Sequence, residues 1–245
     1  MITRRRIYHY VTIESTNDEA KRLALRGEPH GTLVAADEQT AGRGRAGRAW
    51  ITPPRSAIAM TLILRPGIPA HHIPAIALLG GLAVAEGIEQ VSGLRAQIKW
   101  PNDVLIADKK TAGVLAEATF IGDRLDSVVL GIGVNVNAGP PPDLPLDYPA
   151  TCLAAELGRT VDRERVADAI LSAFDALYPQ IGTPALAAAL TARLAMRGKM
   201  IRVTGWNETC TGILERVTDE GAIVVRLDGG ESKTILARDV HLRVL

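Results

Sequence analysis

Short apolar runs alternate with helix-like segments along the first part of the chain. Three runs rich in aliphatic residues predict buried strands, namely Gly31–Ala36, Ser56–Leu64 and Ser127–Val136. A fourth strand is expected to end at Trp100, followed by a hairpin whose strands 103–106 and 112–117 flank a turn at Asp108–Lys110. This mixture predicts an α+β fold in which a mixed β-sheet packs against helices.

The predicted helices of this part differ in apolar content. The polar run Ser15–Glu19 predicts the start of a helix, with Thr16 and Glu19 at capping-box spacing. A second helix is expected near residues 73–90. Its most apolar part, Ile73–Ala85, is too short to span a bilayer, so we expect a helix buried in the core and no membrane association.

The chain changes character after Gly198. Two helices are expected before it, near residues 162–178 and 184–197, with Gly198 as the C-cap of the second. Short β-rich runs separated by Asp-Gly turns follow, at Met200–Val203, Gly221–Leu227 and Thr234–Leu236. We therefore predict two domains, residues 1–197 and 198–245, of which the second is a small antiparallel β-module.

Charge and cysteine content narrow the choice of function. The chain has 28 Lys and Arg against 27 Asp and Glu, so its net charge of +1 provides no broad basic surface for nucleic acid. Its two cysteines, Cys152 and Cys210, are too few for a disulfide framework or a Cys-rich zinc site. Residues Ile7–Glu14 contain no apolar run of signal-peptide length, so we expect a cytoplasmic protein.

The segment Gly42–Arg48, called the Gly-Arg loop below, carries the densest chemical signal. It matches the dinucleotide-binding pattern G-x-G-x-x-G, but the prolines at 53–54 rule out the helix that this pattern requires. Its arginines repel one another unless an anion lies among them, and their forked guanidinium groups favour phosphate or carboxylate; they are Arg43, Arg45 and Arg48. The loop predicts a phosphate-binding site, with a solvated basic loop or an RNA-binding segment as the alternatives.

A second motif, Lys99–Asp103, directly follows a predicted strand. Pro101 fixes a turn from which Asn102 and Asp103 project near Lys99. A lysine and a carboxylate in this arrangement could hold a magnesium–nucleotide complex, because Mg²⁺ prefers one or two carboxylates together with phosphates. A hairpin corner that binds no ligand explains the same residues about as well.

Two further features lie on the hairpin and on the strand after it. Lys110 is expected at the end of a tight turn, where its ammonium could hold a carboxylate beside a phosphate or point into solvent. Gly131 and Gly133 precede Asn135 in a strand, where glycines weaken packing but allow a ligand to approach the backbone closely. A kink in the sheet is the alternative explanation of these glycines.

The order of these motifs resembles that of the biotin–protein ligase family. Five motifs appear in the family's order: Ser15–Asn17, the Gly-Arg loop, Lys99–Asp103, Lys110–Glu117 and Gly131–Asn135. The resemblance extends from about Tyr8 to Ala155, and the β-rich tail matches the family's small SH3-like C-terminal module in position and length. Only Met1–Glu14 precedes the first motif, too little for the winged helix of bifunctional members, so the chain resembles the monofunctional type.

The resemblance implies a fold, a reaction and a partner. The fold would be a class II synthetase-like domain, related to lipoate ligases, followed by an SH3-like β-barrel. Biotin's carboxylate would attack the α-phosphate of ATP, with Mg²⁺, to give biotinyl-5′-AMP and pyrophosphate. A lysine of a biotin carboxyl carrier protein would then attack this mixed anhydride. Bringing two anions together requires cations at the site, and no fixed metal site is expected, although Mg²⁺ bound to ATP could lie near Asp103.

The resemblance also implies roles for individual residues. Those expected to be catalytic are Lys110, ranked first, Arg45, Lys99 and Asp103. Those expected to contact biotin are Ser15, Thr16, Asn17, Gln39, Arg43, Gly44, Arg45, Trp50, Lys110 and Gly113. Those expected to contact ATP or the adenylate are Arg43, Arg45, Arg48, Lys99, Asn102, Asp103, Lys110, Gly133 and Asn135. The residue that covers adenine is not assigned, with Tyr148 as the candidate.

Two other functions remain open at this point. A lipoate or octanoate ligase would share the catalytic fold, although the Gly-Arg loop and Lys99–Asp103 favour the biotin branch. A non-enzymatic RNA-binding module could use the same arginines, but a content of 4% aromatic residues leaves few platforms for stacking bases. We expect no sequence-specific DNA binding, and a homodimer remains open.

Overall fold

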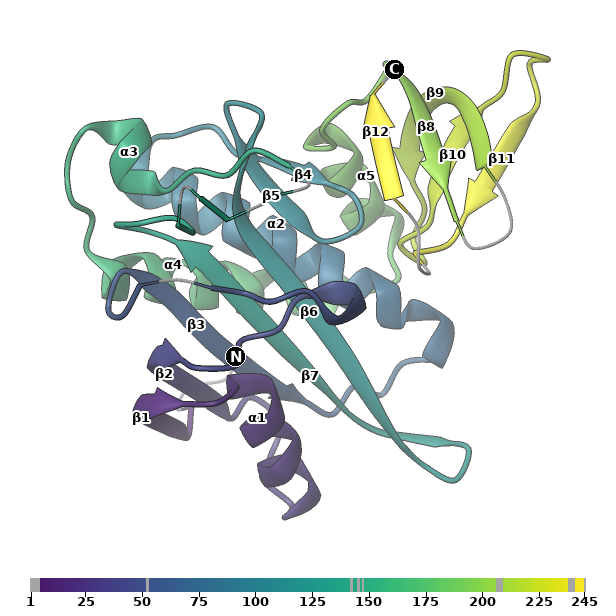
Figure 1. Cartoon of the computed structure of the whole chain (residues 1–245). Coiled ribbons are helices and arrows are strands. Elements are labelled where there is room, and N and C mark those ends of the chain that lie inside the picture. Colours follow the sequence, from purple (N-terminus) through teal and green to yellow (C-terminus); the bar gives the residue numbers. More distant parts are fainter. Residues whose placement is uncertain are drawn as a thin grey trace.

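The computed structural model of the chain describes residues 5–51, 53–141, 143–144, 146, 148–205, 209–237 and 241–244. Figure 1 shows a large twisted sheet with helices on both faces and a small C-terminal sheet beside one end of it. The helices are α1 (Thr16–Leu25), α2 (Ile73–Ser92), α3 (Leu153–Leu157), α4 (Arg163–Leu177) and α5 (Pro184–Ala192).

Seven strands form the large sheet, in the order β1-β2-β3-β7-β6-β5-β4. Their bounds are β1 Ile7–Ile13, β2 Leu33–Gln39, β3 Ala57–Leu64, β4 Gln97–Lys99, β5 Asp103–Ile106, β6 Lys109–Ile121 and β7 Arg124–Asn135. The strands β1 and β2 run parallel, since α1 crosses between them, and every other neighbouring pair is antiparallel. The predicted mixed sheet of an α+β fold is confirmed, whereas β1 was not predicted.

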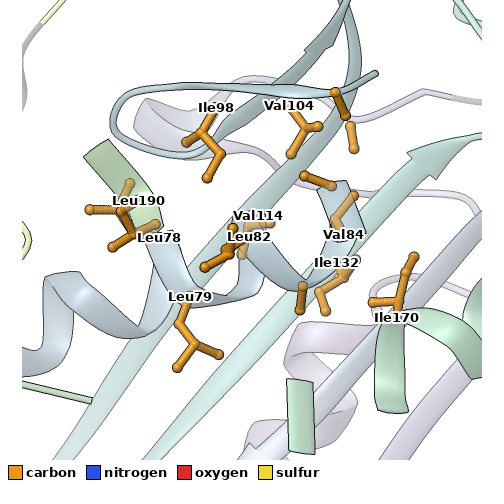
Figure 2. Packing of buried hydrophobic residues seen from close by; sticks show 14 of the residues in the cluster. Leu78, Leu79, Leu82, Val84, Ile98, Val104, Val114, Ile132, Ile170 and Leu190 are labelled. Atoms are coloured by element: carbon orange, nitrogen blue, oxygen red, sulfur yellow. The ribbon is translucent and has the colours of Figure 1, made fainter. Parts of the chain in front are cut away.

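The helix α2 forms the centre of the core. Its side chains Leu78 and Leu82 are fully buried in one cluster with Val114 of β6 and Ile132 of β7 (Figure 2). Ile170 of α4 belongs to the same cluster, because α4 packs alongside α2 on the same face of the sheet. This apolar layer covers one face of the sheet from β2 to β4.

The core helix is longer than its apolar part predicted. The helix continues past Glu86 to Ser92, and the stretch Ala70–Ser92 is long and apolar enough to cross a membrane by length and composition alone. The expectation that it would be too short was therefore wrong. Two-thirds of the residues in its most apolar window are buried inside the fold (67%), as expected of a core helix.

Side chains alternate across the large sheet and give its two faces different chemistry. On β7, Leu130 and Ile132 belong to the apolar core beneath α2. The intervening Gly131 and Gly133 therefore face the other side, where α1 packs. This second face has room for a site.

The cap of α1 differs from the prediction by one residue. The N-cap is Ser15, whose hydroxyl accepts a hydrogen bond from the backbone N–H of Asp18 at 3.3 Å. Thr16 is thus the first helical residue and its hydroxyl is used elsewhere. Glu19 accepts a hydrogen bond from the Tyr10 hydroxyl at 2.7 Å instead of closing a capping box.

The hairpin between β5 and β6 is tighter than predicted. Its turn consists of Ala107 and Asp108, both with positive φ (48° and 57°), as a two-residue type I′ turn requires. The turn predicted at Asp108–Lys110 was therefore wrong. Lys109 and Lys110 are the first residues of β6.

The helix α5 ends earlier than predicted and does not use Gly198 as a C-cap. The chain after it pairs with β4, because Ile98 donates its N–H to the carbonyl of Arg193 and accepts from the N–H of Ala195, both at 2.8 Å. These bonds cover the outer edge of β4, so the chain leaves the helix to protect that edge.

Five strands form a separate antiparallel sheet in the order β11-β10-β9-β8-β12. Their bounds are β8 Met200–Thr204, β9 Thr209–Val217, β10 Ile223–Arg226, β11 Ser232–Ile235 and β12 His241–Val244. The predicted β-rich module is confirmed, although β9 and β12 were not predicted. Within the described strands this sheet is open, with β11 and β12 at its edges, so the expected SH3-like barrel is not confirmed.

Candidate active site

A cavity of about 800 Å³ is lined by the side of the large sheet opposite α2. Its walls come from the start of α1, the Gly-Arg loop, the turn between β4 and β5, the strands β6 and β7, and the end of β12. Every residue to which the sequence assigned a role lines it: Ser15, Thr16, Asn17, Gln39, Arg43, Gly44, Arg45, Arg48, Trp50, Lys99, Asn102, Asp103, Lys110, Gly113, Gly133 and Asn135. The fold thus brings the five motifs to one place.

One group of lining residues is polar and buried. Gln39 Oε1 accepts hydrogen bonds from the backbone N–H of Thr16 at 2.8 Å and from its hydroxyl at 2.9 Å. The Thr61 hydroxyl lies 2.7 Å from Asn17 Oδ1 and 2.9 Å from Thr16 Oγ1. Ser15, Thr16 and Asn17 are nearly inaccessible to solvent. This polar end suits a small ligand head with several hydrogen-bonding groups.

Two glycines of β7 make room for side chains of the site. A Cβ on Gly131 would lie 2.1 Å from Asn17 Oδ1, and one on Gly133 would lie 2.5 Å from the Trp50 indole. We expected these glycines to admit a ligand to the backbone, but they admit Asn17 and Trp50. The indole of Trp50 forms a wall of the cavity, and its buried Nε1 has no hydrogen-bond partner among the described residues.

Lys110 and Lys99 share one carboxylate. The Nζ of Lys110 lies 2.7 Å from Asp103 Oδ1, and that of Lys99 lies 3.7 Å from Asp103 Oδ2. Burial lowers the pKa of Lys99 below its usual value; the charges of Lys110 and Arg48 act in the same direction, while Asp103 opposes them. The Lys99 ammonium also lies 4.9 Å from the centroid of the Tyr148 ring. These cations form a site for an anion.

A β-bulge directs Lys110 into the cavity. The pairing of β5 with β6 shifts register between Val104 and Leu105, which leaves Thr111 as the extra residue. Because the bulge reverses the alternation of side chains, Lys110 lies on the same face as Gly113, with its Nζ 3.5 Å from the Cβ position there. The position of the cation therefore depends on a backbone irregularity that the sequence pattern did not reveal.

The backbone of Lys110 is also held from its other side. Its N–H donates to the Pro149 carbonyl at 2.7 Å, and its carbonyl accepts from the Thr151 N–H at 2.9 Å. The neighbouring Lys109 pairs with Glu156 of α3 at 2.8 Å and does not line the cavity. Of the two adjacent lysines, only Lys110 is available to the site.

The Gly-Arg loop forms a narrow hairpin over the cavity. The Gly44 N–H donates to the Arg48 carbonyl at 2.7 Å, and the Trp50 N–H donates to the Gly42 carbonyl at 2.8 Å. A single 3₁₀ turn, Arg45–Gly47, is its only helical part. In the described part of the chain the glycines are followed by this turn and then by β3, and not by the α-helix that a dinucleotide-binding loop requires.

Two asparagines expected at the nucleotide make different contacts. Asn102 donates its amide to the Val114 carbonyl at 3.1 Å, so it holds the turn onto β6 rather than offering that amide to ATP. Asn135 donates to the Thr151 carbonyl at 3.0 Å, while its buried Oδ1 accepts no hydrogen bond from the described residues. This acceptor remains available to a ligand that carries an N–H group.

Several residues that line the cavity or support its walls had no role assigned from the sequence. Thr61 is fully buried in a strand and gave no pattern apart from its place in an apolar run. Glu117 was part of a motif but had no assigned role. The C-terminal sheet contributes Leu242, Arg243 and Val244 to the cavity, although nothing in the β-rich tail indicated which strand would face it.

Asp103 does not fit as a protein ligand for Mg²⁺, because both of its oxygens face lysine ammonium groups. Across the part of the chain that the structure describes, no group of three or more His, Cys, Asp or Glu side chains could hold a metal ion. Any Mg²⁺ in this cavity would be held by the phosphates of a bound nucleotide.

Residues 8–135 match the model of the biotin/lipoate A/B protein ligase family. The chain belongs to this family. That match alone does not separate biotin from lipoate, since the family includes ligases for both.

Individual relatives of the chain distinguish the biotin branch of the family from the lipoate branch. The chain is 40% identical over 241 residues to the bifunctional ligase/repressor BirA of Bacillus subtilis, which covers 96% of this chain and 73% of that protein. It is 36% identical to the biotin–[acetyl-CoA-carboxylase] ligase of Paracoccus denitrificans, over 89% of this chain and 92% of that one. Its structure is similar to that of the Aquifex aeolicus biotin protein ligase in complex with biotin and ATP, with a TM-score of 0.84, 26% identity, and coverage of 98% and 99%.

Proposed function

We propose that this member of the family is a biotin–protein ligase that uses ATP to convert biotin to biotinyl-5′-AMP, with release of pyrophosphate, and then transfers biotin to a lysine of a biotin carboxyl carrier protein. The observation that carries the proposal is that a buried polar end and a cluster of cations line the same cavity. Such a cavity can hold an uncharged head group and place a carboxylate at the other end beside a nucleotide phosphate. Relatives named as biotin ligases support biotin as the acid.

In the first step, a carboxylate oxygen of biotin attacks the α-phosphorus of ATP, and the bond to the pyrophosphate breaks. Negative charge increases on the α-phosphate oxygens during this step, so Lys110 and Arg45 stabilise the transition state more than the separated substrates. Asp103 holds Lys110 in place and carries no part of the bond change. Lys99 and Arg48 add positive charge at the phosphates.

In the second step, the amine of the acceptor lysine attacks the carbonyl carbon of biotinyl-5′-AMP. The bond between that carbon and the phosphate oxygen breaks, AMP leaves, and the amine loses a proton as the amide forms. The site residues bind and orient the adenylate through both steps, and no side chain forms a covalent intermediate. Ser15, Thr16, Asn17 and Gln39 would hold the ureido ring, with Trp50 along the aliphatic tail.

The remaining assignments extend this proposal. Residues 1–197 would form the catalytic domain and residues 198–245 an SH3-like domain whose strand β12 closes one side of the cavity. The protein would work in the cytoplasm, where its carrier protein is made, without sequence-specific DNA binding. The Asn135 Oδ1, in place of the Asn102 amide, is our candidate for accepting a hydrogen bond from the nucleotide.

Exchange of radiolabelled pyrophosphate into ATP tests the proposal directly. We expect exchange that depends on biotin, that lipoate and octanoate do not support, and that is followed by biotin transfer to a purified carrier domain. Exchange with lipoate alone would assign the chain to the lipoate branch of the family. Absence of exchange with any acid, together with binding of RNA, would favour the non-enzymatic alternative.

A further inference from the structure

Two carboxylates outside the reacting centre connect the polar end of the cavity to the Gly-Arg loop. Asp18 lies on α1, and Glu117 lies on β6 seven residues after Lys110. We refer to them as the carboxylate pair. Neither of them lines the cavity, so neither can touch the substrate.

Glu117 contacts three residues on two segments, α1 and the Gly-Arg loop. Its Oε2 accepts a hydrogen bond from Asn17 Nδ2 at 2.7 Å, and its Oε1 lies 2.6 Å from the Lys21 ammonium. Arg43 of the Gly-Arg loop lies 3.7 Å from the same Oε2. Burial opposes ionisation of Glu117, but Lys21 and Asn17 outweigh it and hold its pKa below the usual value, so the carboxylate stays charged at neutral pH.

Arg43 lies where the two ends of the Gly-Arg loop come together. Its guanidinium forms an ion pair with Asp18, and its backbone pairs with Ala49, the residue before Trp50. An ion pair that holds Arg43 therefore also holds the start and end of the hairpin that bears Arg45, Arg48 and Trp50. The pair Arg43–Asp18 is partly exposed, with 40% and 56% of the side chains accessible, so its effect on the loop should be moderate.

We propose that the carboxylate pair are positioning residues that keep the Gly-Arg loop closed and set the orientation of the Asn17 amide. This inference rests on the proposed function, because the ligand retained under the closed loop is the adenylate. Glu117 has two roles in this proposal, and they can be separated by mutation. Its charge holds Lys21 and Arg43, whereas its oxygen as a hydrogen-bond acceptor fixes Asn17, whose Oδ1 lies over Gly131.

Two substitutions at Glu117 separate the role of its charge from its role as a hydrogen-bond acceptor. Glu117→Gln keeps an oxygen that can accept from Asn17 but removes the charge, whereas Glu117→Ala removes both. Asp18→Asn removes the other charge that holds Arg43. Glu38→Gln is the matched control, because Glu38 is a partly exposed residue of β2 that accepts a hydrogen bond from Thr12 and does not line the cavity.

Three measurements on the full chain distinguish the variants: the rate of tryptic cleavage after Arg45 and Arg48 without ligand, the dissociation rate of preformed biotinyl-5′-AMP, and the affinity for biotin. We expect Glu117→Gln and Asp18→Asn each to speed cleavage and to raise the dissociation rate roughly 2- to 5-fold, as expected for loss of one partly exposed ion pair. Biotin affinity should stay within about 2-fold of wild type in both. Glu117→Ala should in addition weaken biotin binding roughly 10-fold.

The proposal is overturned if Glu117→Gln and Asp18→Asn leave cleavage and adenylate dissociation at the level of Glu38→Gln. It is also overturned if Glu117→Gln and Glu117→Ala weaken biotin binding equally, since charge and hydrogen bonding would then not be separable. Failure of the proposed function would look different. The wild-type chain would show no biotin-dependent exchange, while the cleavage rates would still report whether the carboxylate pair holds the loop.

Discussion

The indole Nε1 of Trp100 donates a hydrogen bond to the Gly221 carbonyl at 3.0 Å, across the boundary between the two sheets. Trp100 is almost completely buried and lies within the turn that presents Lys99 and Asp103. Gly221 belongs to the loop before β10 in the C-terminal sheet. The small sheet is thus fixed to the segment that positions the cations of the site.

Trp100→Phe should lower the free energy of unfolding by about 1–3 kcal/mol, because the Gly221 carbonyl loses its donor and the smaller ring leaves a gap. Urea denaturation of the full chain measures this change. Phe120→Leu, at a half-exposed side chain on β6, serves as the control and should change stability by less than about 0.5 kcal/mol. Equal denaturation midpoints for both variants would contradict a structural role for this bond.

Lys110→Ala should abolish adenylate formation and leave the fold intact. Loss of a charged contact to the transition state costs on the order of 3–4 kcal/mol, which corresponds to a fall of roughly 10²–10³ in the rate of biotin-dependent exchange. Lys109→Ala is a closely matched control, since that lysine pairs with Glu156 away from the cavity. Near-normal exchange in Lys110→Ala would remove Lys110 from the catalytic residues.

Ligand should protect the Gly-Arg loop from trypsin. Each of its three arginines directly follows a glycine, and these glycines lower the stiffness of the loop, so we expect the loop to open more often when no ligand lies beneath it. Cleavage after Arg43, Arg45 or Arg48 should therefore slow when biotin and ATP are added, while cleavage at other sites should not. Identical digestion patterns with and without ligands would argue against this loop as the closing element.

The pH dependence of ATP binding should reflect Lys99. Burial, together with Lys110 and Arg48, lowers its pKa, so it loses its proton at a lower pH than an exposed lysine does. As pH rises through this lowered pKa, the site loses a positive charge and the KM for ATP should increase. Lys99→Arg stays charged over the same range and should remove this alkaline rise. A rise that is identical in both proteins would assign the titration to another group.

Gly131→Ala should weaken biotin binding by displacing Asn17. The added Cβ would lie 2.1 Å from the Asn17 carboxamide, which must move, at a cost of about 1–3 kcal/mol in stability or binding. Gly67→Ala provides the control, because a Cβ there meets no atom within 4 Å. Isothermal titration with biotin measures the effect, and unchanged affinity would show that Asn17 does not support the ligand.

The sequence predicted the strands of the sheet centre and the residues around the cavity because both have strong local signals. Aliphatic runs such as Ser56–Leu64 are typical of buried strands. The five motifs occur in the order that is typical of the biotin–protein ligase family. Local signals also explain the failures. The cap at Ser15 and the two-residue turn at Ala107–Asp108 each differ from the prediction by one or two positions, which is the usual uncertainty of an element boundary.

The features that the sequence did not predict depend on contacts between residues that are far apart in the chain. The bulge at Thr111 depends on how β5 pairs with β6, and the role of Glu117 depends on Asn17, which is 100 residues away in the chain. The contribution of Arg243 requires the C-terminal sheet to dock against the first part of the chain. None of these features produces a periodic pattern, so only the folded arrangement reveals them.

The spacing of residues along β6 limits the length of the acid that the cavity can accept. Lys110 lies beside Gly113, and Glu117, which holds Asn17 at the polar end, is four residues further along. An extended strand advances about 13 Å over that interval and cannot stretch or shorten within a sheet. An acid with a shorter tail would leave its carboxylate out of reach of the ammonium group, and a longer tail would have to bend. The spacing of two residues on one strand thus makes tail length, as well as head group, a condition for reaction.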